Sequence, residues 1–438
     1  MAKKEGLKME HKVLIAVGVL VAVAGIIVLI LWAVGVIGGN KGCNSTFDTL
    51  QQFTSTTAVP VKQLLSADGI FSVTQAIDLQ GNTTELTLLK RQASDEYTVV
   101  ETLTVANAGN DQVSVAFRYD GLQLAIGIPT ANSNAGEVQV YYRSTVDDLL
   151  FANSPNRFTA PTSATTPTFF GRQVLFNNKS TNDNNGLFVS FLSNTGIDGN
   201  VAVYKNVNTT PEWLQTIAGT SSTADENDFG LRFYVQENTW MLINSAAAEQ
   251  LYCYQNISNV WTANNSITGV VTAYPWISPD GLAAIIGDPE YPLIIPPPIQ
   301  GKVSTFSRTS TNSAWTLSAS IEEPGGLVNN SGFGFGVAVS PDNKYAYISG
   351  HVLIDNTSGR IYVYAMNSDY SLVSKVVSTI DYNAKTAEHV VGTAIYAADI
   401  AGSTKRLVTS SNVARSVNDT TVTPIISGSS TKIFQGCL

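Results

Sequence analysis

The sequence predicts an all-β protein of repeated four-stranded sheets, preceded by one membrane-spanning helix. Three observations lead to this prediction. Residues 13–39 form 27 consecutive positions without a charged side chain. After residue 68, short runs of alternating apolar and polar residues are separated by clusters of Asn, Gly, Asp and Ser, as in strands joined by turns. These runs recur as a unit roughly every 40–60 residues, which is typical of a repeat architecture.

The uncharged segment is long enough to be a membrane anchor. About 20 apolar residues span the hydrocarbon core of a bilayer, whereas the apolar core of a cleaved secretory signal has roughly 7–15 residues. The bulky residues from Leu29 to Trp32 extend past that length. We therefore expect residues 13–39 to form an uncleaved transmembrane signal-anchor helix.

Charge sets the expected orientation of this anchor. Residues 1–12 contain four lysines and two glutamates, and an excess of lysine retains a flanking segment in the cytosol. The chain has 25 basic and 34 acidic residues, so removing this cytosolic tail leaves a net charge of −11. We expect the remainder to be extracellular or lumenal, and its acidity excludes nucleic acid as a partner. Residues 40–68, rich in Ser and Thr and interrupted by Pro60, are interpreted as a stalk, which leaves 69–438 as the ectodomain.

The clearest copy of the repeat covers residues 333–373. Pro341, Asp342 and Asn343 favour a tight turn between its first two strands. Its third strand carries apolar residues on both faces, as expected for a strand that is covered on both sides. The four strands of this unit are expected at 333–339, 345–350, 359–364 and 370–373.

Further copies begin near residues 111, 170, 229, 271 and 392. One four-stranded antiparallel sheet per unit, repeated around an axis, is the architecture of a β-propeller, in which each sheet is a blade. The runs 85–90 and 97–100 look like third and fourth strands, and the last copy supplies a first and a second strand. We therefore predict a six-bladed ring that is sealed by both chain ends. Seven blades is the alternative count, because 70–73 and 432–434 remain unassigned.

A ring sealed in this way brings the two ends of the ectodomain together. Cys43 follows the predicted anchor and Cys437 is the penultimate residue. In an oxidising compartment these two residues are the candidate disulfide.

Three sequence elements recur in the same order within the units. They are Phe-Gly pairs at 170–171, 229–230 and 333–334, a Gly-x-Pro element at 127–129 and 287–289, and fourth-strand aromatic residues at Tyr97, Trp213, Trp261, Trp315 and Tyr370. Through these elements, residues 80–434 resemble the FG-GAP β-propeller family, the repeat of integrin α-subunit heads. The resemblance implies a cell-surface role in adhesion or attachment.

Members of that family often bind Ca²⁺ through Asp-x-Asp-x-Asp-Gly loops, because calcium takes several carboxylate oxygens at alternate positions. The nearest segments here, 182–186 and 225–228, lack the alternating aspartates. We therefore expect no cofactor, with Ca²⁺ as the less favoured alternative.

Signatures of catalysis are sparse. Only His351 and His389 lie beyond the N-terminal tail, and we interpret both as surface or turn histidines. The sequence has no Gly-x-Ser-x-Gly, His-Glu-x-x-His, Walker or Cys-x-x-Cys motif. We expect a protein that is not an enzyme. A glycan-active hydrolase or lyase, with carboxylates gathered from separate blades, is the alternative.

One connection differs from the short polar links elsewhere and is the candidate binding loop. It lies between the second and third strands of the unit that begins near 271, and three consecutive prolines favour an extended form. A pre-ordered apolar loop at a propeller rim suits contact with a partner, whereas packing on its own blade is the alternative. The candidate residues are Tyr291, Pro292, Leu293, Ile294, Ile295, Pro296, Pro297 and Pro298.

The leading functional prediction is a single-pass membrane protein that presents a propeller for protein or glycan binding. Nine Asn-x-Ser/Thr sequons are present, and the expected topology would expose them to glycosylation. A structural protein of a virion envelope or capsid is an alternative with the same anchored organisation.

Overall fold

The computed structural model describes residues 47–53, 59–78, 82–106, 113–161, 167–177, 186–193, 199–219, 229–270, 273–289, 301–324, 332–350, 358–384, 389–391, 396–399, 405–414 and 430–437. They belong to one compact unit, Thr46–Leu438. The predicted tail, the predicted anchor 13–39 and Cys43 lie outside the described residues. Within the described part of the chain, no helix has the length and apolar character needed to cross a membrane.

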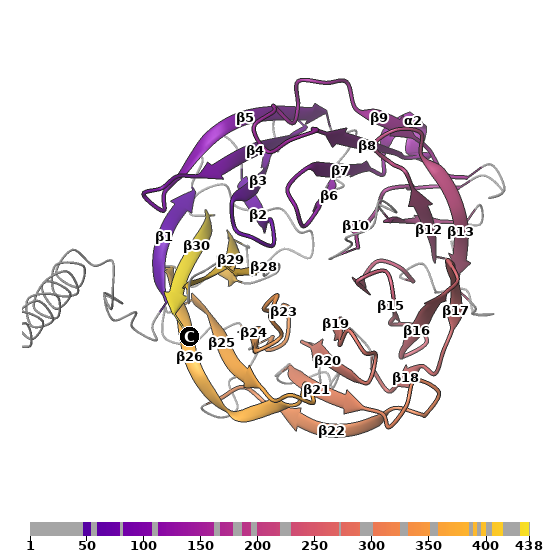
Figure 1. Ribbon diagram of the computed structural model, residues 1–438, viewed down its shortest axis with the longest axis vertical. Coiled ribbons are helices and arrows are strands. Elements are labelled where there is room, and N and C mark those ends of the chain that lie inside the picture. Colours follow the sequence, from indigo (N-terminus) through magenta and orange to yellow (C-terminus); the bar gives the residue numbers. More distant parts are fainter. Residues whose placement is uncertain are drawn as a thin grey trace, which may run out of the picture. The chain divides into compact units, whose positions relative to one another are not determined.

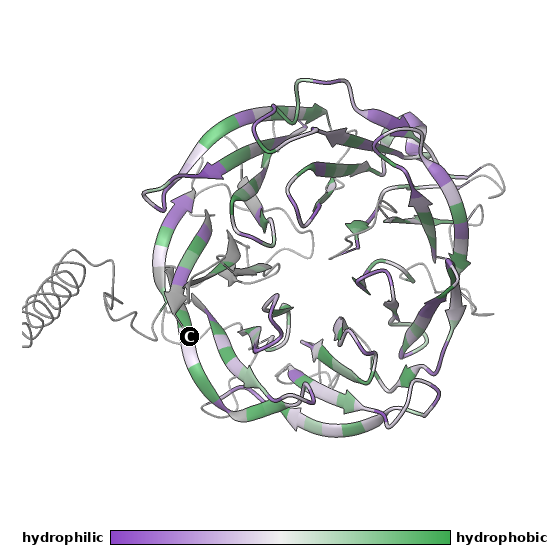
Figure 2. Ribbon diagram, in the orientation of Figure 1, coloured by the Kyte–Doolittle hydropathy of each residue, from purple (hydrophilic) through white to green (hydrophobic). Residues whose placement is uncertain are grey.

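The described strands form seven antiparallel sheets around a ring, one for each blade (Figure 1). The fold is a seven-bladed β-propeller, which confirms the predicted all-β class and the alternative of the two predicted blade counts. In each blade the first strand lies nearest the centre of the ring and the last lies on the outer rim (Figure 1). Figure 2 shows hydrophobic residues along the strands and hydrophilic residues at many of the turns.

The first three blades each contain four strands. Blade 1 consists of β2 (Val59–Leu65), β3 (Phe71–Asp78), β4 (Thr83–Arg91) and β5 (Tyr97–Ala106). Blade 2 consists of β6 (Ser114–Phe117), β7 (Gln123–Ile128), β8 (Glu137–Tyr142) and β9 (Asn156–Phe158), with the short helical turn α2 (Ala131–Asn134) between β7 and β8. Blade 3 consists of β10 (Val174–Phe176), β11 (Leu187–Leu192), β12 (Gly199–Lys205) and β13 (Glu212–Ala218).

The next three blades repeat this order. Blade 4 consists of β14 (Phe233–Gln236), β15 (Trp240–Ser245), β16 (Gln250–Ile257) and β17 (Val260–Ala263), with β18 (Ile267–Thr268) also paired to β16. Blade 5 consists of β19 (Tyr274–Ile277), β20 (Ala283–Asp288), β21 (Lys302–Ser307) and β22 (Thr316–Ile321). Blade 6 consists of β23 (Val337–Val339), β24 (Tyr345–Gly350), β25 (Ser358–Met366) and β26 (Leu372–Ala384).

Blade 7 is assembled from both ends of the ring. From the C-terminal end come β27 (His389–Val391), β28 (Tyr396–Asp399), β29 (Lys405–Ala414) and β30 (Ser430–Cys437). Its outer strand is β1 (Asp48–Phe53), which pairs with β30. The side-chain amide of Gln51 in β1 also binds blade 1, because its Oε1 accepts from the Tyr97 N–H at 2.9 Å and its Nε2 donates to the Tyr97 carbonyl at 3.0 Å. Strand β1 therefore connects the last blade to the first, and such closure protects sheet edges.

Closure by both chain ends agrees with the sequence analysis, but the strands that provide it differ. The runs 85–90 and 97–100 lie in β4 and β5, the third and fourth strands of blade 1. The first and second strands of that blade are β2 and β3, and not strands from the C-terminal end of the chain. Strands β1 and β2 fall within 40–68, the segment interpreted as a stalk, so the propeller begins earlier than the sequence pattern indicated. Pro60 lies in β2 beside a register irregularity, a position where a proline without an N–H is tolerated in a strand.

The hydrophobic core lies between neighbouring blades. One cluster joins Phe71 of β3 to Val115 and Ile126 of blade 2, and all three side chains are at most 1% exposed. A second joins Val140 of blade 2 to Phe170 and other residues of blade 3. Because a sheet must bury its apolar face against another element, each blade depends on its neighbours for stability.

The Phe-Gly pairs lie at three of these junctions, just ahead of the first strand of a blade. Each phenylalanine is buried, and its carbonyl meets a glycine near the start of the third strand of the preceding blade. A Cβ atom placed on Gly199 would lie 2.0 Å from the Phe229 oxygen, a separation that real Cβ atoms do not show. The contacts are Gly136 with Phe170, Gly199 with Phe229, and Gly301 with Phe333.

The glycine of the Gly-x-Pro element makes a second contact of the same kind. A Cβ on Gly127 would lie 2.1 Å from the Gly171 carbonyl oxygen, and a Cβ on Gly287 would lie 2.0 Å from the Gly334 oxygen. Gly334 has φ +92°, a backbone conformation that residues with a side chain rarely adopt. The two sequence elements are thus partners across blade boundaries, and we call these backbone contacts the glycine junctions.

The antiparallel order of each blade gives the ring two distinct faces. The first-to-second turns and third-to-fourth connections open on one face, which we call the turn face. The second-to-third connections and the links to the next blade open on the other, which we call the loop face. This division decides which side chains can act together on a partner.

Most of the exposed large apolar side chains in the described part of the chain are at the turn face, whereas most connections of the loop face are outside that part. Nine of the eleven found among the described residues lie in turns or connections of that face, or within the first four residues of an outer strand, and a tenth, Ile257, is the last residue of the third strand β16 at the same face. The eleventh, Val377, is the sixth residue of β26. We call the first ten the turn-face apolar residues: Ile70, Val99, Val100, Val146, Leu149, Trp213, Leu214, Ile257, Val260 and Leu317.

The glycine junctions predict the outcome of adding one methyl group. We expect Gly199→Ala to lower the free energy of unfolding by about 2–3 kcal/mol, because the new Cβ must displace backbone of the next blade. Gly186→Ala is the matched control, since its Cβ would meet only ordinary contacts of 3.4 Å or more. Urea unfolding of the full chain, followed by tryptophan fluorescence, measures both. Equal stabilities of the two variants would contradict the proposed role of the junctions.

Ring closure gives a second prediction. We expect Gln51→Ala to cost about 1–2 kcal/mol of unfolding free energy, because two backbone groups of Tyr97 lose their partner. The neighbouring Gln52 is exposed, so Gln52→Ala should leave the stability unchanged. Thermal unfolding of the two variants side by side makes the comparison, and indistinguishable midpoints would show that this side chain does not join the two ends.

Candidate functional site

The candidate binding loop 291–298 lies outside the described residues, but the strands that carry it are described. Strand β20 ends at Asp288 and β21 begins at Lys302, so the loop connects the second and third strands of blade 5, as the sequence predicts. By the order of the strands it emerges on the loop face. The described residues around its two ends form the candidate site.

Three consecutive blades place a cation and two aromatic rings side by side at the loop-face ends of their first strands. Tyr274 is the first residue of β19, and its ring lies 5.2 Å from the ring of Phe335, centroid to centroid, at an interplanar angle of 33°. The guanidinium carbon of Arg232 lies 5.0 Å from the centroid of Tyr274. All three side chains are half-buried. Stacked aromatic rings and a cation near a ring face attract one another, so this stack is held in place while part of it stays accessible.

A buried carboxylate lies next to this stack. Asp288, at the end of β20, is only 3% exposed, and it is paired in register with Lys302 of β21. Burial lowers the pKa of Lys302, and the charge of Asp288 opposes that shift. A Cβ on Gly334, which immediately precedes Phe335, would lie 3.1 Å from the Asp288 nitrogen, so stack and carboxylate belong to one neighbourhood.

A second buried carboxylate extends the site towards blade 6. Glu323, which follows β22, is 8% exposed and accepts a 2.8 Å hydrogen bond from the hydroxyl of Tyr362 in β25. Burial and the neighbouring Glu323 raise the pKa of Tyr362. The Tyr362 ring meets the Phe333 ring edge to face, at 5.6 Å between centroids. The segment Phe333–Gly334–Phe335 therefore touches both carboxylate regions and the stack.

The chemistry of this arrangement suits recognition. Arginine and tyrosine are among the side chains that dominate binding energy at interfaces. Among the described residues, no group of three or more His, Cys, Asp or Glu side chains is placed to hold a metal ion. Of the segments considered for Ca²⁺, 182–186 and 225–228, all residues except Gly186 are outside the described part of the chain.

The other predicted site residues lie away from this region or outside it. Cys437 is in β30, whose backbone pairs with Lys405, whereas its proposed partner Cys43 is not among the described residues. His389 is in β27, and His351 is outside the described part. Cys253 of β16 is 1% exposed, and burial raises the pKa of its thiol to about 12, which makes the thiol inert.

Sequence reasoning did not identify Arg232, Tyr274 or Phe335. Each lies at the first strand of its blade or at most two residues before it, and Arg232 and Phe335 also follow a Phe-Gly pair within two residues. The available signal was an aromatic or basic residue within two residues of the start of the first strand in three consecutive units. The alternating pattern of the strands identifies residues inside the strands, and these three residues lie at or before the strand starts, where that pattern gives no information.

No protein-family model and no curated protein sequence matches the chain. Among solved structures, the WD40 domain of coronin from Toxoplasma gondii is 10% identical over 89% of this chain and 86% of that chain, with a TM-score of 0.49. The Dos1 propeller is 13% identical over 90% of this chain and 81% of that chain, also with a TM-score of 0.49. At these values the similarity concerns the fold alone, and no ligand or activity of those proteins follows for this chain.

The Tyr362–Glu323 contact generates a prediction with an internal control on the same strand. We expect Tyr362→Phe to lower the unfolding free energy by about 1–3 kcal/mol, because a buried carboxylate loses a donor. Tyr364 is equally buried, but its hydroxyl has no hydrogen-bond partner among the described residues, so Tyr364→Phe should be neutral or stabilising.

Denaturant unfolding at pH 7 compares the two variants. Because the pKa of Tyr362 is raised in the folded state, its contribution is complete below the ordinary tyrosine value of 10.0 and decreases as the pH rises beyond it. A larger loss for Tyr364→Phe than for Tyr362→Phe would refute the assignment.

Proposed function

We propose that the chain is a membrane-anchored β-propeller that binds a protein partner on the non-cytosolic side, through the loop face of blades 4 to 6. The observation that carries this proposal is the half-buried stack of Arg232, Tyr274 and Phe335 at the base of an apolar, proline-rich connection. A rigid platform of this kind meets a partner with little loss of conformational freedom.

Two features of the site support recognition of a protein. Tyr and Arg are enriched at the centres of protein interfaces, where water is excluded around them. The adjoining loop, residues 291–298, contributes Tyr291 and a run of Leu, Ile and Pro, and loops that carry function commonly project from a rigid scaffold. The partner would contact the stack first, and the loop would enlarge the contact.

Anchoring rests on the sequence. The 27 uncharged residues at 13–39 and the lysines before them favour a single span with the propeller outside the cytosol. The proposal is one of attachment or adhesion without catalysis. We also propose that the chain is related to the FG-GAP propellers. In support, the Phe-Gly and Gly-x-Pro elements that carry the resemblance contact one another at the blade boundaries.

A binding experiment with paired variants tests the site. The full chain is used to capture partners from the extracellular and membrane fractions of cells that express it, and captured proteins are identified by mass spectrometry. We expect Tyr274→Ala and Phe335→Ala to weaken capture at least about tenfold, because loss of a central interface side chain costs about 2 kcal/mol or more.

Trp213→Ala is the matched control, because Trp213 is an exposed aromatic residue of the turn face, at 42%. It should capture the partner as well as the unaltered chain. Urea unfolding confirms that each variant remains folded. Capture that survives both stack substitutions but fails with Trp213→Ala would refute the site. A glycan array probed with the same variants tests for a carbohydrate ligand. The ligand is a carbohydrate if the stack substitutions reduce the array signal and leave protein capture unchanged.

A further inference from the structure

The longest third-to-fourth connection in blades 1 to 6 belongs to blade 2. It joins β8 to β9 on the turn face and comprises residues 143–155. The corresponding connections of the other five blades are 92–96, 206–211, 258–259, 308–315 and 367–371. Neighbouring antiparallel strands need only roughly two to five residues to be joined. The length of this connection is therefore not explained by the need to join its strands.

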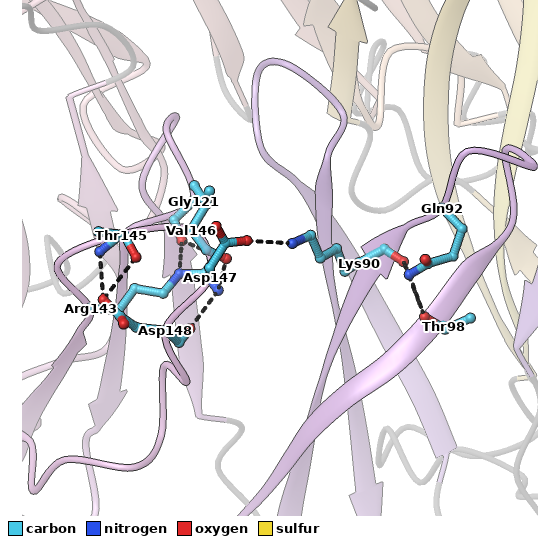
Figure 3. Close-up of polar contacts among 9 residues, drawn as sticks. All are labelled: Lys90, Gln92, Thr98, Gly121, Arg143, Thr145, Val146, Asp147 and Asp148. Carbon is cyan, nitrogen blue, oxygen red and sulfur yellow. Dashed lines mark hydrogen bonds and ion pairs between the residues drawn. The ribbon is translucent and has the colours of Figure 1, made fainter.

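A buried arginine fixes the first half of this connection (Figure 3). Arg143 is 4% exposed, and its guanidinium carbon lies 4.0 Å from the centroid of the Phe71 ring. Its Nη1 donates to the carbonyl oxygens of Val146 and Asp148, at 3.3 Å each, and its Nη2 donates to the Gly121 oxygen at 2.8 Å. The backbone of the connection is thus folded around a charged group that blades 1 and 2 hold in place.

Blade 5 shows which part of this arrangement belongs to the fold. Arg308 follows the third strand β21 as Arg143 follows β8. Its Nε donates to the Gly281 oxygen at 2.6 Å, and its guanidinium carbon lies 4.7 Å from the ring centroid of Trp240 in blade 4. An arginine at this position therefore serves a blade boundary. The Nη1 of Arg308, however, donates to the side chain of Asn264 in the preceding blade at 2.6 Å, whereas in blade 2 the same nitrogen holds the connection itself.

Blade 1 holds the rest of the connection. Lys90 pairs with Asp147 at 3.0 Å (Figure 3). The carboxylate of Glu101 in β5 accepts the backbone N–H groups of Leu150 and Phe151, at 2.6 and 3.1 Å. The side chain of Leu150 is fully buried in the apolar cluster between blades 1 and 2. Because the connection is ordered in advance, a partner that binds it meets little loss of conformational freedom.

Between these two anchored parts, four consecutive residues are exposed, and we call residues 146–149 the blade-2 tip. Val146 and Leu149 at its two ends are 38% and 51% exposed. Single exposed apolar side chains are common on protein surfaces and need no explanation. These two differ because hydrogen bonds and an ion pair to buried or neighbouring groups fix the backbone that presents them. Such a fixed apolar pair is suited to insertion into a pocket of a partner.

The charges of the tip indicate the kind of partner. Asp147 and Asp148 lie between the two apolar residues, and the side chain of Asp147 is 83% exposed. Of the two cations that contact the connection, Arg143 is buried and the Lys90 side chain is 34% exposed. The accessible charge is thus mainly negative, and the whole chain has a net charge of −9. A second copy would set carboxylate against carboxylate, whereas a basic surface is attracted.

We infer that the blade-2 tip is a second protein-binding site, for a partner with an apolar pocket bordered by lysine or arginine. Val146 and Leu149 enter the pocket, and the two aspartates between them meet the basic residues at its border. The site is on the turn face, opposite the candidate site of blades 4 to 6, so one chain can hold two partners at once. The inference depends neither on that site nor on the membrane anchor.

Selection from a phage-displayed library of random linear peptides tests the site. The library is first depleted on the full chain with Val146→Ser and Leu149→Ser, which removes peptides that bind elsewhere, and is then selected on the unaltered full chain. We expect the enriched peptides to combine apolar residues with lysine or arginine. In fluorescence anisotropy, the most enriched peptide should bind the double variant at least about tenfold more weakly, as expected when central interface side chains are truncated. Ile257→Ser with Val260→Ser, an exposed apolar pair in a turn-face hairpin of blade 4, is the matched control and should bind normally.

A charge variant tests the second half of the inference and does not alter the apolar residues. Asp147→Asn should weaken binding of the same peptide about threefold or more and reduce its dependence on salt, because an exposed charge is removed. No peptide enriched after depletion, enriched peptides without basic residues, or unchanged affinity in Asp147→Asn would overturn the inference. A dimer of the unaltered chain that the serine substitutions dissociate, seen by sedimentation, would assign the tip to a second copy and overturn it as well. Tyr274→Ala should leave the peptide bound, which separates this site from the one on the loop face.

Discussion

The close approach of backbone to backbone at the glycine junctions is the constraint on which the ring depends. At Gly127, Gly199 and Gly287, a single added carbon would lie 2.0–2.1 Å from a carbonyl oxygen of the next blade. In a closed ring, a wider gap at one junction must be taken up at the others, because the angles between blades must add to a full turn. The spacing of all seven blades therefore depends on a few positions without side chains, and the apolar clusters between blades then pack at the density usual in protein interiors.

The same junctions build the candidate site. Phe333 and Gly334 form the contact between blades 5 and 6, and the next residue, Phe335, extends that contact into the stack with Tyr274. The ring of Phe333 also orients Tyr362 towards Glu323. A segment that serves the fold thus positions the groups proposed to bind a partner, so its local geometry is rigid without additional elements. The strand order separates this site from the turn-face apolar residues by the full height of a blade.

Much of the fold could be predicted from the sequence because its signals are local. Alternating strands, turn residues and the repeated Phe-Gly pairs are properties of short segments, and they gave the all-β propeller and its sealed ring. The blade count depended on β1 and β2, which were hidden by a Ser/Thr-rich composition and by Pro60 at a register irregularity. The stack could not be predicted, because Arg232, Tyr274 and Phe335 come from three blades and only the ring makes them neighbours. The predicted loop 291–298 lies outside the described residues, although it emerges beside that stack.

Native-state hydrogen exchange of the full chain tests most directly whether the ring is closed by β1 and held as one unit. In this account β1 is the outer strand of blade 7 and Gln51 connects it to blade 1. The amides of residues 48–53 should therefore exchange with the same opening free energy as the amides of β30 and β5 when denaturant is added. The exchange of all three strands should then converge at the global unfolding free energy. If β1 exchanges as fast as an isolated strand while the other blades remain protected, the closed ring is contradicted.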